Sequence, residues 1–262
     1  MKDPGTAARP RTVLSLFAHP DDETFGPGGT LARLADEGHA LHLMCATRGE
    51  SGSIGKSSSY GRRRLAALRE AELEAAREVL GIRSLEIIGL PDGGLRRLEP
   101  ETLVLPFVRA IRTFRPDILI TFHADGISGH ADHRTVTART LTAWERAADR
   151  AFAPHLGEPH ATPRVWAYSI PDSAARRVTH RKLYSVPDEA VDAVLEVSAY
   201  SPVKRRAVEV HATQKLFIED MERRLGGLGA LWGRECFVLA ASRVPLPGKA
   251  PRPVEDLFAG MP

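Results

Sequence analysis

Residues 12–23 read TVLSLFAHPDDE, an apolar run that passes directly into an imidazole and three carboxylates. The run at 12–17 predicts a buried strand, and the end of a strand is a rigid place for reactive groups. His19 and Asp22 are three residues apart, so a tight turn can aim a nitrogen and an oxygen at one metal ion, with Asp21 left between them. We therefore expect a metal or catalytic site where this strand ends.

A second polar block lies much later in the chain, where residues 129–134 read GHADHR after another apolar run at 117–122. Catalytic zinc usually takes three nitrogen or oxygen ligands from the protein and keeps a fourth position for water, whereas thiolates are more usual in closed structural sites. His19, Asp22 and His133 match the catalytic kind of zinc site, which keeps one position open. We take these three residues as the candidate metal ligands.

The hydrophobic pattern predicts strands alternating with helices. The expected strands are at 12–17, 40–47, 85–88, 117–122, 165–169 and 193–197, and the expected helices are at 28–37, 62–80, 103–114, 132–152 and 203–215. Such alternation indicates an α/β fold, a Rossmann-like doubly wound and mostly parallel sheet, with a small C-terminal α/β extension. If the strand order is 3-2-1-4-5, the first and fourth strands are neighbours, and both polar blocks lie in the crevice beyond their carboxyl ends.

The two polar blocks together resemble the LmbE-like or PIG-L family of zinc-dependent N-acetylglucosaminyl deacetylases. Further motifs support the resemblance: TRGE at 47–50, REAE at 69–72, LPDG at 90–93 and HATQ at 211–214. The similarity covers roughly residues 12 to 216 in the expected order. It implies a hydrolase that removes acetyl from an N-acetyl amino sugar with one Zn²⁺ per chain, other divalent metals being alternatives.

Three residues near the candidate ligands are expected to act in catalysis. Asp21 neighbours a ligand, within one water of the metal, and both this position and the resemblance favour a general base; its alternative role is a helix N-cap. His130 is an oxyanion partner or a proton donor to the leaving amine, or else a loop histidine at the surface. Asp132 hydrogen-bonds a histidine and fixes its tautomer, caps a helix, or does both.

The resemblance further implies that Arg69, Asp92 and His211 contact the substrate. Arg69 and Asp92 match positions that hold sugar hydroxyls, and His211 matches a late histidine element of the family. From the residues alone, Arg69 would be a solvated helix residue paired with Glu70 or Glu72, and Asp92 a turn former beside a proline and a glycine.

The composition is that of a soluble globular protein, since 43% of the 262 residues are hydrophobic and 26% are charged. We expect one domain at 12–244, made of a Rossmann-like core at about 12–170 and an extension at about 171–244. The ends at 1–11 and 245–262 are rich in Pro, Gly and charge and are expected to be tails. A docked segment at 254–258 is the alternative for the C-terminal end.

The net charge is +3, and the basic residues are scattered except for two short clusters at 62–64 and 204–206. Such short clusters are usually solvated helix faces, so we expect no nucleic-acid partner. Cys45 in an expected strand and Cys236 near another form no disulfide framework. No apolar run is long enough to cross a bilayer and no secretion signal is evident, so we expect a cytoplasmic protein without a membrane partner. The expected partner is a small amino-sugar substrate, and the sequence leaves open whether copies form a homo-oligomer.

Two other functions are compatible with these residues. A metal-dependent amidase acting on another small acylated amine would keep the same ligands. A non-catalytic sugar-binding module would keep the crevice but would not need Asp21, so the presence of Asp21 favours an enzyme.

Overall fold

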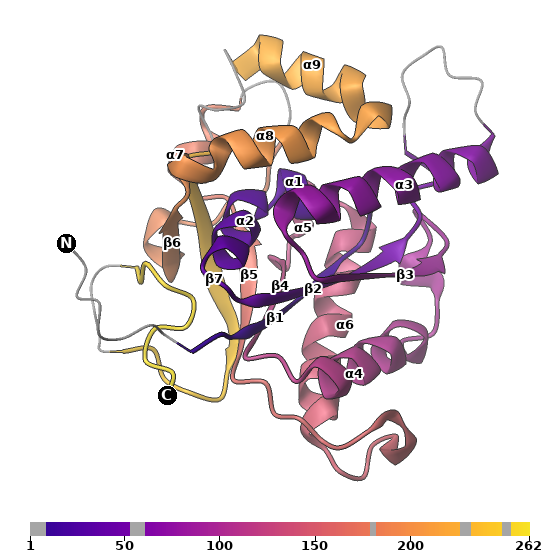
Figure 1. The fold of residues 1–262 in the computed structure, drawn as a ribbon, viewed down its shortest axis with the longest axis vertical. Coiled ribbons are helices and arrows are strands. Elements are labelled where there is room, and N and C mark those ends of the chain that lie inside the picture. Colours follow the sequence, from indigo (N-terminus) through magenta and orange to yellow (C-terminus); the bar gives the residue numbers. More distant parts are fainter. Residues whose placement is uncertain (1–8, 53–60, 179–181, 226–231, 248–252) are drawn as a thin grey trace.

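The computed structural model describes residues 9–52, 61–178, 182–225, 232–247 and 253–262. Its centre is a seven-stranded sheet with the strand order β3-β2-β1-β4-β5-β7-β6 (Figure 1). The strands are β1 (Thr12–Phe17), β2 (Ala40–Thr47), β3 (Ser84–Leu90), β4 (Ile118–Phe122), β5 (Arg164–Ser169), β6 (Ala193–Glu196) and β7 (Arg234–Ser242). The first five are parallel, which confirms the predicted order 3-2-1-4-5, and β7 runs antiparallel to both β5 and β6.

Two apolar layers cover the sheet because successive strand residues point to opposite faces. Val13 and Phe17 of β1 pack with α2 (Gly28–Asp36), α3 (Arg62–Leu80) and α8 (Ser201–Glu209) on one face. Leu14 and Leu16 pack with α4 (Glu101–Phe114) and α6 (Ala131–Ala148) on the other (Figure 1). Both faces of β1 are therefore buried, as expected for a strand inside a doubly wound sheet.

The remaining elements are short or peripheral. The other helices are α1 (Asp22–Phe25), α5 (Gly126–Gly129), α7 (Asp172–Ala175) and α9 (Lys215–Leu225). Single 3₁₀ turns lie at Leu95–Arg97, Pro154–Leu156, Asp188–Ala190, Ser198–Tyr200 and Ala212–Gln214. None of the helices in the described ranges is both long and apolar enough to cross a membrane.

The predicted bounds of α3 are confirmed. The helix ends at Leu80, and Gly81 follows with φ 73°, a left-handed conformation that glycine adopts without a steric penalty.

The helix predicted at 132–152 is wrong at its C-terminal end, because α6 stops at Ala148. The buried guanidinium of Arg112, on α4, donates to the carbonyls of Ala147, Asp149 and Phe152 and to two others nearby. These bonds satisfy the carbonyls at the helix end and hold the following residues in a turn.

The helix predicted at 203–215 is also too long, because α8 ends at Glu209. His211 turns inward beyond it to contact Glu23, and the backbone N–H of Thr213 donates to Glu72 on α3. Tertiary hydrogen bonds thus replace the continuation of the helix.

The C-terminal part of the chain extends the main sheet. β7 contains Cys236, which the sequence analysis placed near a strand, and it inserts between β5 and β6. Residues 253–262 dock against this edge: Val254 bridges Ala193, and the buried Leu257 accepts hydrogen bonds through its carbonyl from Arg164 and Trp166. The alternative of a docked segment therefore holds for residues 253–262. Residues 1–8 of the expected N-terminal tail lie outside the described residues.

Candidate metal and active site

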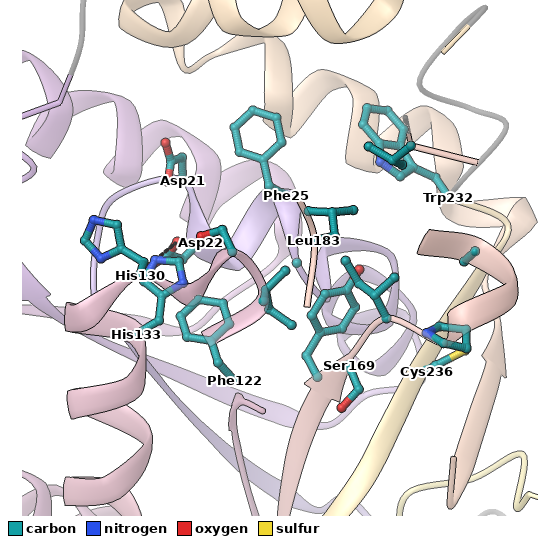
Figure 2. Close-up of a pocket in the computed structure, with 18 of the residues that line it drawn as sticks. Asp21, Asp22, Phe25, Phe122, His130, His133, Ser169, Leu183, Trp232 and Cys236 are labelled. Carbon is teal, nitrogen blue, oxygen red and sulfur yellow. Dashed lines mark ion pairs between the residues drawn. The ribbon is translucent and has the colours of Figure 1, made fainter. Parts of the chain in front are cut away.

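The candidate site lies beyond the carboxyl ends of β1 and β4. These two strands are parallel neighbours with Val13 opposite Ile118, so the segments that follow them emerge at the same edge of the sheet. The first segment carries His19 and Asp22, and the second carries His133 at the start of α6. The fold thus brings together His19 and His133, which are 114 positions apart. Figure 2 shows Asp22 next to His133.

The three predicted ligands converge on one point. Nδ1 of His19 lies 3.2 Å from Nε2 of His133. The two carboxylate oxygens of Asp22 face these atoms, with Oδ1 3.3 Å from His133 Nε2 and Oδ2 3.6 Å from His19 Nδ1. One cation could contact all three side chains from this point.

The outer hydrogen bonds of the two imidazoles decide which nitrogens are free to bind a metal. His133 Nδ1 lies 3.1 Å from the carbonyl of Gly126, which accepts its proton, so Nε2 carries the lone pair. His19 Nε2 faces Asp92 at 3.1 Å and Asp132 at 3.3 Å, which leaves the lone pair on Nδ1. When both rings are neutral, two lone pairs and a carboxylate point at one another and repel unless positive charge, from a proton or a metal ion, lies between them. This donor set therefore fits a divalent metal.

The charges around His19 also favour a cation. Burial lowers the pKa of His19, but hydrogen bonds to Asp132 and Asp92 and the charge of Asp22 outweigh burial and raise the pKa to about 10. Burial raises the pKa of Asp22, but the neighbouring His133 and His19 and the backbone N–H of His19 outweigh it and hold the pKa below its usual range. Asp22 is therefore ionised at neutral pH, as a carboxylate that binds a metal has to be.

Two other groups of donor atoms also lie within 4.8 Å of one another. The first contains His19, His130 and His133, and so shares two residues with the predicted set. The second contains His19, Asp92 and Asp132, and it surrounds the Nε2 side of the His19 ring. Since Nε2 of His19 is used for hydrogen bonding, a metal ion would be expected on the opposite, Nδ1 side of the ring.

Asp21 occupies a strained turn beside the ligands. Its φ of 111° is rare for a residue other than glycine, and such conformations persist where the surroundings enforce them. Its backbone N–H donates to Glu23 at 3.1 Å, and its side chain does not cap the following helix. Burial raises the pKa of Asp21 to about 6, the charge of Arg69 opposes this rise, and Asp22 adds to it.

His130 is the N-cap of α6. Its Nδ1 accepts the backbone N–H of Asp132 at 3.2 Å, so the neutral ring carries its proton on Nε2. The ring lies edge-on to that of His19, with centroids 4.7 Å apart. Burial and the adjacent His19 and His133 lower the pKa of His130, which favours the neutral, hydrogen-bond-donating form.

Asp132 is buried and connects three segments of the site. One oxygen accepts the backbone N–H of Leu95 at 3.1 Å, and the other accepts that of Gly93 at 2.7 Å and lies 3.3 Å from His19 Nε2. The predicted partner of Asp132, a histidine, is therefore His19. This carboxylate orients the ring of His19 and stabilises its Nε2–H tautomer.

Among the predicted substrate contacts, Arg69 and Asp92 line the cavity and His211 does not. Arg69 is buried and binds Asp21 together with the carbonyls of Gly49 and Pro20. Asp92 accepts the backbone N–H of Ser51 at 2.8 Å and also faces His19. Arg69 and Asp92 thus each contact a residue of the candidate site, Asp21 and His19 respectively.

His211 is completely buried behind the site and lies 3.0 Å from Glu23. Glu23 in turn accepts the backbone N–H of Asp21. The sequence analysis assigned no supporting role to Glu23, although the residue belongs to the polar block at 19–23.

A cavity of about 1130 Å³ opens at the site. Its polar end contains Asp21, Asp22, His130 and His133, and Trp232 and Cys236 lie at the opposite end (Figure 2). Sequence reasoning did not find this second end, because its residues come from segments far apart in the chain and follow no motif.

Comparison with known proteins identifies similar sequences. Residues 14–144 match the family model described as PIG-L, GlcNAc-PI de-N-acetylase. The chain is 31% identical to a 1D-myo-inositol 2-acetamido-2-deoxy-alpha-D-glucopyranoside deacetylase from Rhodococcus erythropolis, over 97% of this chain and 99% of the relative. It is also 31% identical to the enzyme of the same name from Thermobispora bispora, over 96% and 99% of the two chains.

Solved structures share the fold. The N,N'-diacetylchitobiose deacetylase from Pyrococcus horikoshii superposes with a TM-score of 0.68 at 18% identity, over 88% of this chain and 84% of the other. The 4-carboxy-2-hydroxymuconate hydratase GalB from Pseudomonas putida KT2440 gives a TM-score of 0.67 at 19% identity, over 90% and 98%. The same fold therefore supports more than one reaction, and the function has to be argued from the site.

Proposed function

From the premise that this chain belongs to the PIG-L family of de-N-acetylases, we propose that it is a zinc-dependent N-deacetylase acting on a small molecule that contains N-acetylglucosamine. The observation that carries the proposal is the convergence of His19 Nδ1, His133 Nε2 and the Asp22 carboxylate. The other nitrogen of each ring is hydrogen-bonded, which leaves His19 Nδ1 and His133 Nε2 free to bind the metal. A nitrogen and oxygen donor set without thiolate is typical of catalytic zinc.

Zinc held by these residues would polarise the amide carbonyl and lower the pKa of a water molecule toward about 7. Asp21, which adjoins Asp22 and lines the cavity, would accept the proton of that water. Its pKa of about 6 suits a base at neutral pH, because most Asp21 side chains are then ionised and still basic enough to take a proton. The charge of Arg69 helps to keep Asp21 in its ionised form.

His130 supplies a hydrogen-bond donor to the reacting amide. With Nδ1 occupied by the Asp132 backbone N–H, its Nε2–H is available to bind the developing charge on the carbonyl oxygen. The leaving amine then takes the proton that Asp21 has collected, because a neutral His130 that gave up its Nε2 proton would be left as an imidazolate. The carboxylate of Asp132 keeps His19 in the orientation needed for metal binding.

Arg69 and Asp92 are proposed to contact sugar hydroxyls, since both line the cavity beside the ligands. Arg69 would do so while holding Asp21. His211 lies behind Glu23 and outside the cavity lining, so we assign it a positioning role in place of direct substrate contact.

The proposal is tested by measuring bound metal and amine release together. The purified protein is expected to carry close to one zinc per chain and to deacetylate at least one compound among N-acetylglucosamine, its glycosides with malate and inositol, and diacetylchitobiose. Removal of the metal with a chelator should abolish the reaction, and added zinc should restore it. Hydrolysis of simple acetylated amines with no sugar processed would instead indicate the amidase alternative.

A further inference from the structure

The cavity is larger than an amino sugar requires. Its volume of about 1130 Å³ exceeds the range of about 300–1,000 Å³ that is usual for sites enclosing drug-sized ligands. The catalytic residues occupy one end, and a second end continues past Phe25 and Leu183 toward Trp232 and Cys236 (Figure 2). An N-acetylglucosaminyl group bound at the metal would leave this second end empty.

The floor of the second end is made of small side chains. Ser169, Cys236 and Val194 are partners in register on the adjacent strands β5, β7 and β6, and all three line the cavity. Burial raises the pKa of the Cys236 thiol to about 11, so it is neutral and behaves as a small apolar group. Small residues at three neighbouring positions create the open space above the sheet.

The opposite wall is aromatic and begins next to the metal ligands. Phe25 lies three residues after Asp22 on α1, and its ring packs edge-on against Phe217 of α9 with centroids 5.5 Å apart. Trp232 belongs to the same apolar cluster as Phe25. Among the described residues the exposed large apolar side chains are Tyr184, Leu216 and Phe217, and Phe217 lines this cavity. Apolar surface of this kind commonly marks a binding site.

Two of the charged groups that line the second end are paired with other side chains. Asp188 accepts the hydroxyl of Ser173 at 2.6 Å, and Arg234 lies 3.2 Å from Glu196. Arg177 adds one further cation to the lining. These three charged side chains are exposed, whereas Cys236 on the floor and Trp232 on the wall are buried. Between the floor and the wall a polyol would lose water, whereas an apolar group would gain contacts on both sides.

We propose that the substrate carries an apolar aglycone, alkyl or aryl, that occupies this second end while the N-acetylglucosaminyl group lies at the metal. This inference rests on the proposed function, which supplies the sugar end. The residues that select the aglycone are Val194, Cys236, Phe25 and Trp232.

The test compares zinc-loaded wild-type protein with Val194→Phe, which fills the floor from a position away from the ligands. Amine release is measured for methyl, hexyl, octyl and phenyl glycosides of N-acetylglucosamine and for its inositol glycoside. The value of kcat/KM should rise with aglycone length by up to about fourfold per buried methylene group. Val194→Phe should reduce the octyl-to-methyl ratio by about tenfold and leave the methyl glycoside within about twofold.

The matched control is Val238→Phe, since Val238 packs in the same apolar cluster as Val194 but is not among the described residues that line the cavity. This variant should keep the wild-type ratio. Equal kcat/KM for all aglycones, or a preference for the inositol glycoside that Val194→Phe does not alter, would overturn the inference.

A binding measurement tests the apolar subsite independently of the proposed deacetylase activity. The octyl glycoside should change the fluorescence of Trp232, and the change should disappear in Trp232→Phe and weaken in Val194→Phe. If no glycoside is deacetylated but this binding is observed, the proposed function fails and the apolar subsite stands. If the octyl glycoside neither binds nor reacts while the methyl glycoside is deacetylated, the subsite is rejected and the proposed function stands.

Discussion

Nη2 of Arg69 lies 2.8 Å from Oδ2 of Asp21, and both side chains lie in the candidate site. The same guanidinium donates to the carbonyls of Gly49 and Pro20, so it connects the turn after β1 with the loop after β2. It therefore both positions the proposed base and influences its charge.

This ion pair predicts a shift in pH dependence. Asp21, with a pKa of about 6, must be ionised to act as base, so kcat/KM should fall as the pH drops below about 6. Arg69 favours the ionised form, and its loss in Arg69→Met should raise the pKa and move the acid limb to higher pH by about 1–3 units. Arg69→Lys keeps the charge and should move the limb less. If the acid limb of the pH profile did not move in Arg69→Met, the group that titrates would not be Asp21.

Substitution of the two adjacent aspartates should have different effects. Asp21→Asn should retain metal and reduce kcat by about a hundredfold to ten-thousandfold, the usual range for loss of a general base. Asp22→Ala should lose metal, because it removes one of the three proposed ligands. Metal analysis of the purified variants, together with amine release, checks both. Near wild-type turnover in Asp21→Asn would contradict the assigned role.

The variant His130→Ala tests whether His130 is a metal ligand or only a hydrogen-bond donor to the substrate. If the ligands are His19, Asp22 and His133, the variant should keep its metal and lose rate, because a hydrogen-bond donor to the carbonyl oxygen typically contributes about a hundredfold or more. If His130 is itself a ligand with His19 and His133, the variant should lose metal affinity instead. Titration of the metal-free protein with zinc gives the answer directly.

The buried ion pair of Lys204 and Glu235 should stabilise the fold without taking part in the proposed reaction. Their side chains are 1% exposed and 2.6 Å apart, and Glu235 also accepts the backbone N–H groups of Gly29 and Thr30 at the start of α2. Lys204→Met leaves Glu235 buried without its cation and should lower the free energy of unfolding by about 3–5 kcal/mol.

Lys215→Met is the control for this prediction. Lys215 forms an exposed pair with Glu219 at 3.8 Å, and such pairs contribute about 0–1 kcal/mol. Urea denaturation of both variants measures the difference. A loss in Lys204→Met no larger than in Lys215→Met would show that the buried pair is not needed for stability.

Local sequence patterns were enough to predict much of this protein. The apolar run at 12–17 and the residues after it predicted β1 and the turn with His19 and Asp22, and the apolar spacing from Arg62 to Gly81 predicted α3. These predictions succeeded because burial of one face and the conformational preference of glycine act within a few residues. The alternation of strands and helices then restricted the sheet to few topologies, which placed both polar blocks in one crevice.

Contacts between distant segments decided the rest. Arg112 ends α6, Arg69 pairs with Asp21 and not with a neighbour on its own helix, and β7 inserts between β5 and β6. The apolar end of the cavity likewise depends on residues from α1, β5, β6, β7 and α9 that meet only after folding. A side chain's hydrogen-bond partner and the space left beside it depend on three-dimensional packing, and no pattern of neighbouring residues encodes either one.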